Sequence, residues 1–220
     1  ATATGDGSGS KPESAMALSV VSAAVKTIAH FLPATRMALA DAGQLRTLID
    51  TFLRYGLLEE LEQQIMTGAG GNDLTGIDSS SPNTQAYDTD ILTTTRKGRT
   101  QVVTEGRSMP TAFVMNPLDW QTFDLLQDNE ARYFFGGPSQ MGNPRLWGLP
   151  VVESEAVTQG YVYVADWRLC ALWMRQDAQI LVSDSHSDFF TRNMIAILAE
   201  LRAAFSLIRP LAMVQCDITA

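Results

Sequence analysis

Charged residues are scarce in this sequence of 220 residues, making up 18% of it against roughly 25% in an average globular protein. A chain with few charges has less surface that it can leave in water, which favours burial against partner subunits. The charges present are mainly acidic, 16 Lys and Arg against 24 Asp and Glu, for a net charge of −8. This balance argues against sequence-specific nucleic-acid binding, which depends on basic side chains that neutralise phosphates.

Cysteine and long apolar runs are also lacking. Cys170 and Cys216 are too few for a disulfide scaffold or a structural zinc site, and we expect buried thiols in a reducing compartment. No apolar run reaches the ~18 residues of a membrane span, and the N-terminus carries no charged-then-apolar signal segment. The sequence therefore predicts no association with a membrane.

Catalytic and ligand-binding motifs are missing as well. The sequence contains no GxxxxGK[ST], GxGxxG or HExxH. His30 and His186 are far apart and have no cysteine at metal-ligand spacing, so His30 is interpreted as a core or interface group. The run from Ser183 to Asp188 holds the residue types of a hydrolytic triad, but triad members normally meet from distant segments, and a polar turn is favoured. We expect no cofactor, no metal and no enzyme activity.

The residues that are present predict a mixed pattern of helices and strands. Residues 18–32 are rich in Val and Ile and predict one or two strands ending before Pro33. Leu and Ile then recur at threes and fours over 41–66, which predicts one helix of 26 residues, capped by Asp41 and able to bend at Gly56. Such a length is about twice the average of 11–12 residues, which indicates a spine shared by neighbouring units.

The second half of the chain predicts shorter elements and one ambiguous segment. Residues 68–90 predict a turn-rich loop. Helices are expected at 93–106 and 119–126, and strands at 112–115, 147–152, 161–165, 170–173, 180–183 and 211–218. Residues 189–216 suit a helix by Ala and Leu content and a strand by their alternation from Ile195 to Phe205, and pattern alone leaves both open. Four aromatic residues are predicted to be packing groups without a ligand: Trp120, Trp147, Tyr133 and Phe134.

Six segments, taken in order, resemble the major capsid proteins of tailed phages of the Hong Kong 97 type. They are KPES at 11–14, AVKTIAHFLPATRMALADA at 24–42, YGLLEELEQQIMTGAG at 55–70, NPLDWQTFDLLQDNEARYFFGGP at 116–138, LWGLPVV at 146–152 and FFTRNMIAILAELRAAFSLIRPLAMV at 189–214. The resemblance implies an α+β fold with a peripheral domain (long spine helix plus long β-sheet), an axial domain (central sheet flanked by helices) and a truncated extended loop. It also implies a strand after residue 190, and we predict one there against the helical propensity.

The domain boundaries follow from the same resemblance. Residues 1–17 are expected to be a remnant of the extended loop or a flexible arm. Residues 18–67 and 173–208 would form the peripheral domain, and 68–172 with 209–220 the axial domain. Because the family's N-terminal arm and the outgoing half of the loop are missing, we expect this chain to assemble poorly.

The function implied by the resemblance is structural. Copies of the protein would form hexamers and pentamers of an icosahedral phage head around DNA, a component of the virion that assembles in the host bacterial cytoplasm with a scaffold, a maturation protease and a portal as possible partners. The resemblance also implies an autocatalytic isopeptide crosslink between subunits, with Lys11 as nucleophile, Asn193 as its target and Glu200 as proton acceptor. In the alternative interpretation these three residues are a surface lysine, a turn residue and a salt-bridge partner.

Two other functional classes stay open on the sequence. One is an encapsulin-like cellular shell that encloses enzymes instead of DNA. The other is a soluble α/β enzyme without a recognisable motif. Neighbouring portal, protease and terminase genes would favour the phage head, and a strict monomer would favour the enzyme.

Overall fold

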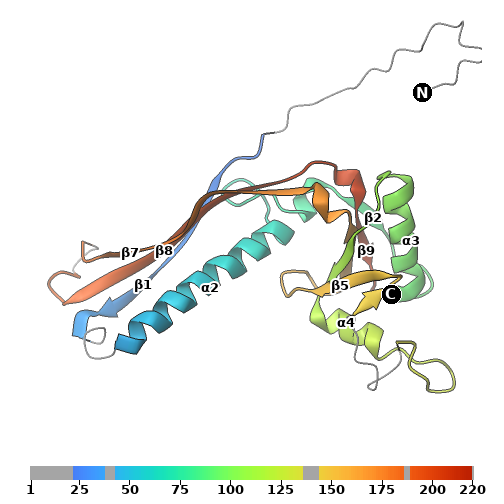
Figure 1. Ribbon diagram of the computed structural model, residues 1–220, viewed down its shortest axis with the longest axis horizontal. Helices are drawn as coiled ribbons and strands as arrows, with labels where there is room; N and C mark the ends of the chain where they lie inside the picture. The colour runs from blue at the N-terminus through green and yellow to red at the C-terminus, as the bar shows by residue number, and fades with distance from the viewer. Residues whose placement is uncertain (1–21, 38–42, 136–143, 186–188, 220) are drawn as a thin grey trace, which may run out of the picture.

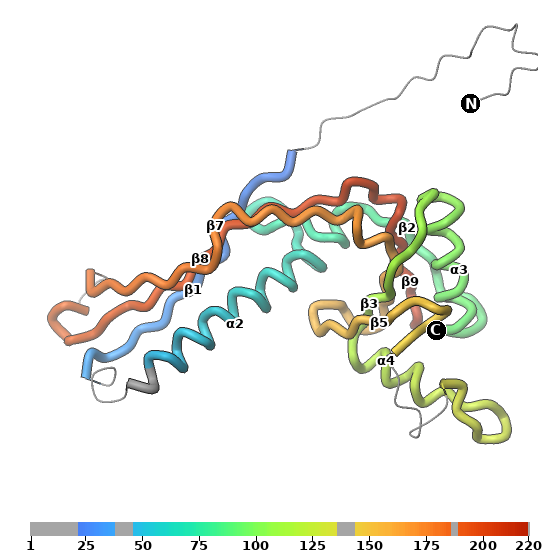
Figure 2. Tube along the Cα trace, viewed as in Figure 1, coloured from blue at the N-terminus to red at the C-terminus, as the bar shows by residue number. Residues whose placement is uncertain are grey.

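In the part of the chain that the structure describes, two sheets and three α-helices make up a long, asymmetric molecule (Figure 1). The computed structural model describes residues 22–37, 43–135, 144–185 and 189–219. A three-stranded sheet in the order β1-β8-β7 and the long helix α2 form an arm, and a six-stranded sheet in the order β2-β9-β6-β3-β5-β4 forms the compact part. The tube view shows the strands of the arm and α2 running side by side away from the compact part (Figure 2).

The arm begins with β1 (Lys26–Thr35), an edge strand antiparallel to β8. The prediction that this strand stops before Pro33 is wrong, because Pro33 lies within it, opposite Ala196. Proline cannot donate to a β-ladder, but an edge strand pairs on one side only and therefore tolerates it. The predicted start at residue 18 lies outside the described residues.

Helix α2 (Gly43–Thr67) is continuous, as the apolar periodicity predicted, while the proposed Asp41 cap lies outside the described residues. Leu53, Leu57 and Leu61 bury one face of the helix against the arm sheet. Gly56 allows β1 to approach closely, since a Cβ there would lie 2.9 Å from Cε1 of His30. Nε2 of that histidine lies 2.9 Å from the Leu53 carbonyl, which confirms His30 as a satisfied group between strand and helix.

The ambiguous segment is the central strand of the arm. β8 (Met194–Leu207) pairs with β1 on one side and with β7 (Cys170–Ser183) on the other, which confirms the prediction of a strand. Its alternate residues Ile197, Ala199 and Leu201 face α2 and are buried, so tertiary burial outweighs helical propensity here. β7 is one strand with two register shifts, and the prediction of two separate strands is wrong.

The compact part surrounds the antiparallel pair β6 (Tyr161–Ala165) and β9 (Met213–Asp217). β3 (Ala112–Met115) and β6 have the predicted bounds, and β9 lies within the predicted 211–218. The other strands are β5 (Leu149–Glu153), β4 (Arg145–Leu146) and β2 (Asn83–Gln85), the last within a segment predicted as loop. Helix α3 (Ile91–Thr104) packs on β9 and β6, and α4 (Pro117–Asp124) follows β3.

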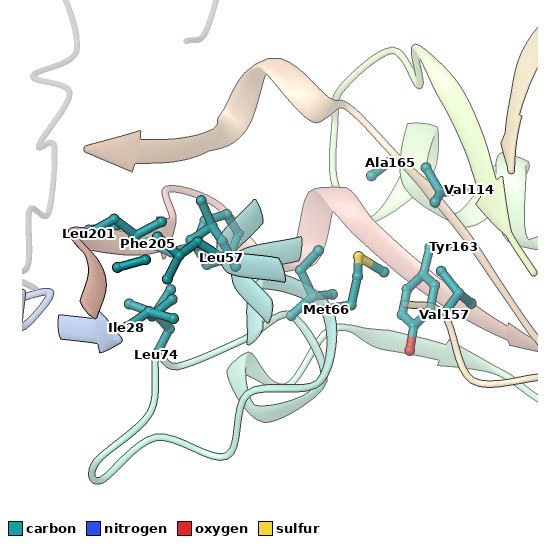
Figure 3. Packing of buried hydrophobic residues seen from close by; sticks show 14 of the residues in the cluster. Ile28, Leu57, Met66, Leu74, Val114, Val157, Tyr163, Ala165, Leu201 and Phe205 are labelled. Carbon is teal, nitrogen blue, oxygen red and sulfur yellow. The ribbon is translucent and has the colours of Figure 1, made fainter. Parts of the chain in front are cut away.

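A continuous hydrophobic cluster joins the arm to the compact part (Figure 3). Leu57, Leu201 and Phe205 gather at the arm end of the cluster, and Tyr163 lies at the other end with Met66 between them. Polar bonds add to this junction: Ser154 donates to Glu62 at the end of α2 (2.6 Å), and the Tyr163 hydroxyl donates to Asp78. The two sheets therefore share one core.

Candidate functional site

Two of the three residues predicted to form a crosslink lie in or directly before β8. Lys11 lies outside the described residues. Asn193 immediately precedes β8, is exposed and has φ of 54°, a left-handed conformation that asparagine tolerates better than most residues. Its carbonyl accepts a hydrogen bond from the Arg36 amide at 2.9 Å, which ties this turn to the end of β1. The Asn193 side chain is thus presented on a tethered turn at the tip of the arm.

Glu200 lies in the middle of β8, half-buried, on the sheet face opposite to α2. Its neighbours across the sheet are Ala29 on β1 and Gln179 on β7. One carboxylate oxygen, Oε1, accepts a hydrogen bond of 3.0 Å from Nε2 of Gln176. We call the face on which Glu200 stands the open face, because none of the described helices covers it (Figure 1).

Apolar side chains flank Glu200 on the open face. Phe31 and Leu181 lie on either side of Leu198 in the register, and they are 53% and 49% exposed. Arg202 lies on the other side of Glu200 along β8 and is exposed. A surface that covered this patch would remove water from the Glu200 carboxylate, and desolvation favours the neutral form of a carboxyl group.

One copy of the protein does not bring Asn193 and Glu200 together. Asn193 directly precedes β8, and the six strand steps of ~3.3 Å from Met194 to Glu200 alone span about 20 Å. A reaction that needs both residues at one point therefore needs them from different copies. The strand does not fold back to shorten this distance, because β8 is paired continuously with β1 from Met194 to Ala203.

Gln176 is a polar contact of Glu200 that sequence reasoning missed. From Met174 to Gln179, β7 advances five residues while β8 advances three, from Ala203 to Glu200. The two extra residues are bulges, which bring the amide of Gln176 within reach of a carboxylate that faces Gln179 in the register. No pattern in the sequence marks these bulges.

The helix side of the arm sheet contains a cavity of about 440 Å³. Its floor is aliphatic, with Ile180, Ile195 and Ile197 from the sheet, and its rim carries Arg36, Arg46 and Arg54. Two of the arginines already have acidic partners, Arg36 with Asp184 and Arg54 with Asp50. Because it opens on the α2 side, this cavity is separate from the surroundings of Glu200.

The predicted aromatic packing groups divide into two kinds. Trp120 is buried and stacks on Phe123. Trp147, Tyr133 and Phe134 are 41%, 38% and 58% exposed, so the prediction that they are packing groups is wrong for these three in one isolated copy. Trp147 instead donates through Nε1 to Thr95 Oγ1 (3.2 Å) and lies under Arg96, at 5.9 Å from Cζ to the ring centroid.

The remaining candidate groups that the structure describes do not form a ligand site. Among the residues that the structure describes, no three His, Cys, Asp or Glu side chains are placed to hold a metal ion. His186 lies outside the described residues. Cys216 is buried, and burial raises the pKa of its thiol to about 12. Within the described ranges, no helix is long and apolar enough to cross a membrane.

Known proteins resemble this chain in sequence and in fold. The phage capsid family matches residues 1–217. The major capsid protein of Enterobacteria phage HK97 is 38% identical over 214 residues, which cover 93% of this chain and 54% of that protein, so the chain spans about half the length of this relative.

Solved structures with the same fold come from several phages and from a GTA particle. A structure from Microbacterium phage Oxtober96 has a TM-score of 0.76 at 15% identity, covering 98% of this chain and 80% of the other. One from Gordonia phage Cozz has a TM-score of 0.75 at 15% identity, with coverages of 96% and 79%. The capsid of a native GTA particle has a TM-score of 0.72 at 18% identity, covering 97% of this chain and 82% of the other.

Proposed function

Because the chain belongs to the phage capsid family, we propose that it is the main structural subunit of a phage head and that its copies form hexamers and pentamers of an icosahedral shell. The 38% identity to a major capsid protein over 93% of the chain carries this proposal. The exposed apolar side chains on both faces of the arm support it, among them Phe52, Tyr55 and Leu58 on α2. Surfaces of this kind are typical of subunit interfaces.

The division into peripheral and axial domains is part of the proposal. Residues 18–67 and 173–208 would form the peripheral domain, and 68–172 with 209–220 the axial domain. The separate arm and central sheets support this division. The assembling shell would have three partners: a scaffold, a maturation protease and a portal. The protein itself would be located in the finished virus particle.

The shell proposal is tested by electron microscopy of the full-length protein expressed alone and with its neighbouring genes. Closed particles built from rings of six and five are expected. A protein that stays monomeric in size-exclusion chromatography under all these conditions would refute it. Particles filled with enzyme instead of DNA would support the encapsulin-like alternative.

We further propose that assembled subunits are joined by an isopeptide bond between Lys11 and Asn193. Glu200, covered by a neighbour, takes a proton from the Lys11 ammonium, and the neutral amine attacks Cγ of Asn193. A C–N bond forms, a second proton passes from the attacking nitrogen to Nδ2, and the tetrahedral intermediate collapses as the Cγ–Nδ2 bond breaks and ammonia leaves. The extended separation of Asn193 and Glu200 supports this proposal, because it makes the reaction wait for assembly.

Mass spectrometry and denaturing gels of full-length shells test the crosslink. Each bond should remove about 17 Da, the mass of ammonia, and leave subunits that no longer migrate as monomers. Glu200→Gln should assemble and stay monomeric on the gel, because the proton acceptor is gone. Lys11→Arg should do the same, because a guanidinium stays protonated. Wild-type shells that migrate wholly as monomers would refute the crosslink and leave the shell proposal intact.

A further inference from the structure

We infer that Gln176 is a positioning residue for Glu200, which keeps its carboxylate ionised once a neighbouring subunit covers the open face. This inference rests on the proposed crosslinking reaction and concerns its proton acceptor. It begins from the hydrogen bond of 3.0 Å between Nε2 of Gln176 and Oε1 of Glu200.

The local structure is built to bring this amide to the carboxylate. Gln176 stands opposite Arg202 in the register, two residues along β8 from Glu200, and a bulge lies on either side of it in β7. Its amide also donates to Oε1 of Gln179 at 3.1 Å, so both bonds from Nε2 have acceptors on this face. The Gln176 side chain is half-buried and therefore restrained, whereas Gln179 is exposed.

The chemistry of a covered base explains why this bond matters. The flanking Phe31, Leu181 and Leu198 make one side of the surroundings of Glu200 apolar, and desolvation favours the neutral form of a carboxyl group. A protonated Glu200 cannot accept the lysine proton. A hydrogen bond to Oε1 stabilises the ionised form and leaves Oε2 to receive that proton.

Few other charges act on Glu200 from this sheet. Arg202 follows it on the same face of β8, and the β7 bulge carries Arg175 and Asp177. The opposing residues of β1, Thr27 to Phe31, include no ionisable group on this face. Among the described residues no ion pair involves Glu200, and Gln176 is the side chain that donates to it.

The experiment measures the rate of crosslink formation in full-length shells across a pH series, by densitometry of denaturing gels. In Gln176→Leu the acidic limb of the rate profile should move to higher pH by about one unit, with a rate about tenfold lower on that limb and a similar alkaline plateau. Gln176→Glu should move the limb further, because it places an acceptor and a like charge beside Glu200. Gln179→Asn is the matched control and should keep the wild-type profile, because the position opposite Glu200 stays polar and Gln176 still donates to Glu200.

The other outcomes would overturn either the positioning role of Gln176 or the crosslinking reaction itself. An unchanged profile in Gln176→Leu, or a rate lowered equally at every pH, overturns the positioning role while the crosslink stands. If neither Gln176 variant forms particles by electron microscopy, Gln176 is a structural residue and the inference is wrong. Wild-type shells without crosslinks overturn the reaction itself and this inference with it.

Discussion

Two buried aspartates show how nearby hydrogen-bond donors affect the pKa of a carboxyl group. Asp119 in α4 is 5% exposed, and burial raises its pKa although the Gly160 amide donates to it at 2.9 Å. Asp166 is 4% exposed, but bonds from Arg168 and from Ser108 (2.6 Å) hold its pKa down at about 2, against the opposing effect of burial. Asp166 has several donors, one of them a guanidinium, and they outweigh the effect of burial, whereas Asp119 has a single backbone donor that does not.

Asp166 should make stability depend on pH at the acidic end. Its pKa is lower in the folded protein than its ordinary 3.8, so its contribution is complete above that value and is lost as the pH falls toward about 2. Asp166→Asn should lower the free energy of unfolding at pH 7 and flatten its dependence on pH in this window. Urea unfolding at a series of pH values measures both, with the exposed Asp124→Asn as control. An equal slope in Asp166→Asn and wild type would contradict this assignment.

At the scale of elements, helix α3 packs very closely against the central sheet of the compact part. Gly98 of α3 lies against Cys216 of β9, and a Cβ at position 98 would lie 2.2 Å from the Cys216 Sγ. Val164 and Val214 line the same contact at 3.4 and 3.6 Å. The glycine is therefore required by packing, although alanine is the better helix former by about 1 kcal/mol.

Gly98→Ala should reduce the free energy of unfolding by about 1–3 kcal/mol, because overpacking at this contact outweighs the gain in helix propensity. Thr100→Ala, on the exposed side of the same helix, controls for propensity and should be close to neutral. Adding Cys216→Ala to Gly98→Ala removes the colliding sulfur and should restore part of the loss. Chemical denaturation measures the three variants, and a Gly98→Ala protein as stable as wild type would show that the contact is loose.

At the scale of the whole molecule, the angle between arm and compact part is held by the shared core and by polar bonds around it. Tyr163 is 1% exposed, donates to Asp78 and accepts from Gln215 at 2.8 Å. Burial and the neighbouring Asp78 both raise the pKa of its hydroxyl, which therefore stays a donor at any ordinary pH. The hydroxyl ties the loop that follows α2 to the central sheet.

Tyr163→Phe should lower the free energy of unfolding by about 1 kcal/mol, since it removes the bond to Asp78 and leaves Gln215 without its acceptor. Tyr87→Phe removes an exposed hydroxyl bonded to the Thr89 carbonyl and is the matched control. Thermal unfolding of both variants measures the difference. Equal melting temperatures would mean that the apolar cluster alone holds the junction.

The sequence by itself determined the elements whose signal is local. The periodicity of α2 depends on residues three and four apart, and β3 and β6 are short apolar runs bounded by turns, so each could be predicted without the rest of the chain. The resemblance to phage capsid proteins predicted β8 as a strand and named Asn193 and Glu200. Charge and the missing motifs limited the classes of function.

Only the tertiary structure decided features that depend on pairing between distant segments. Pro33 fits inside β1 because that strand is at an edge, and β2 forms because β9, about 130 residues later, offers it a partner. The exposure of Trp147 depends on which distant segments of the chain pack against it, and its neighbours in the sequence do not reveal them. Gln176 reaches Glu200 through two bulges that arise only when β7 pairs with β8, because a register shift is a property of two strands together.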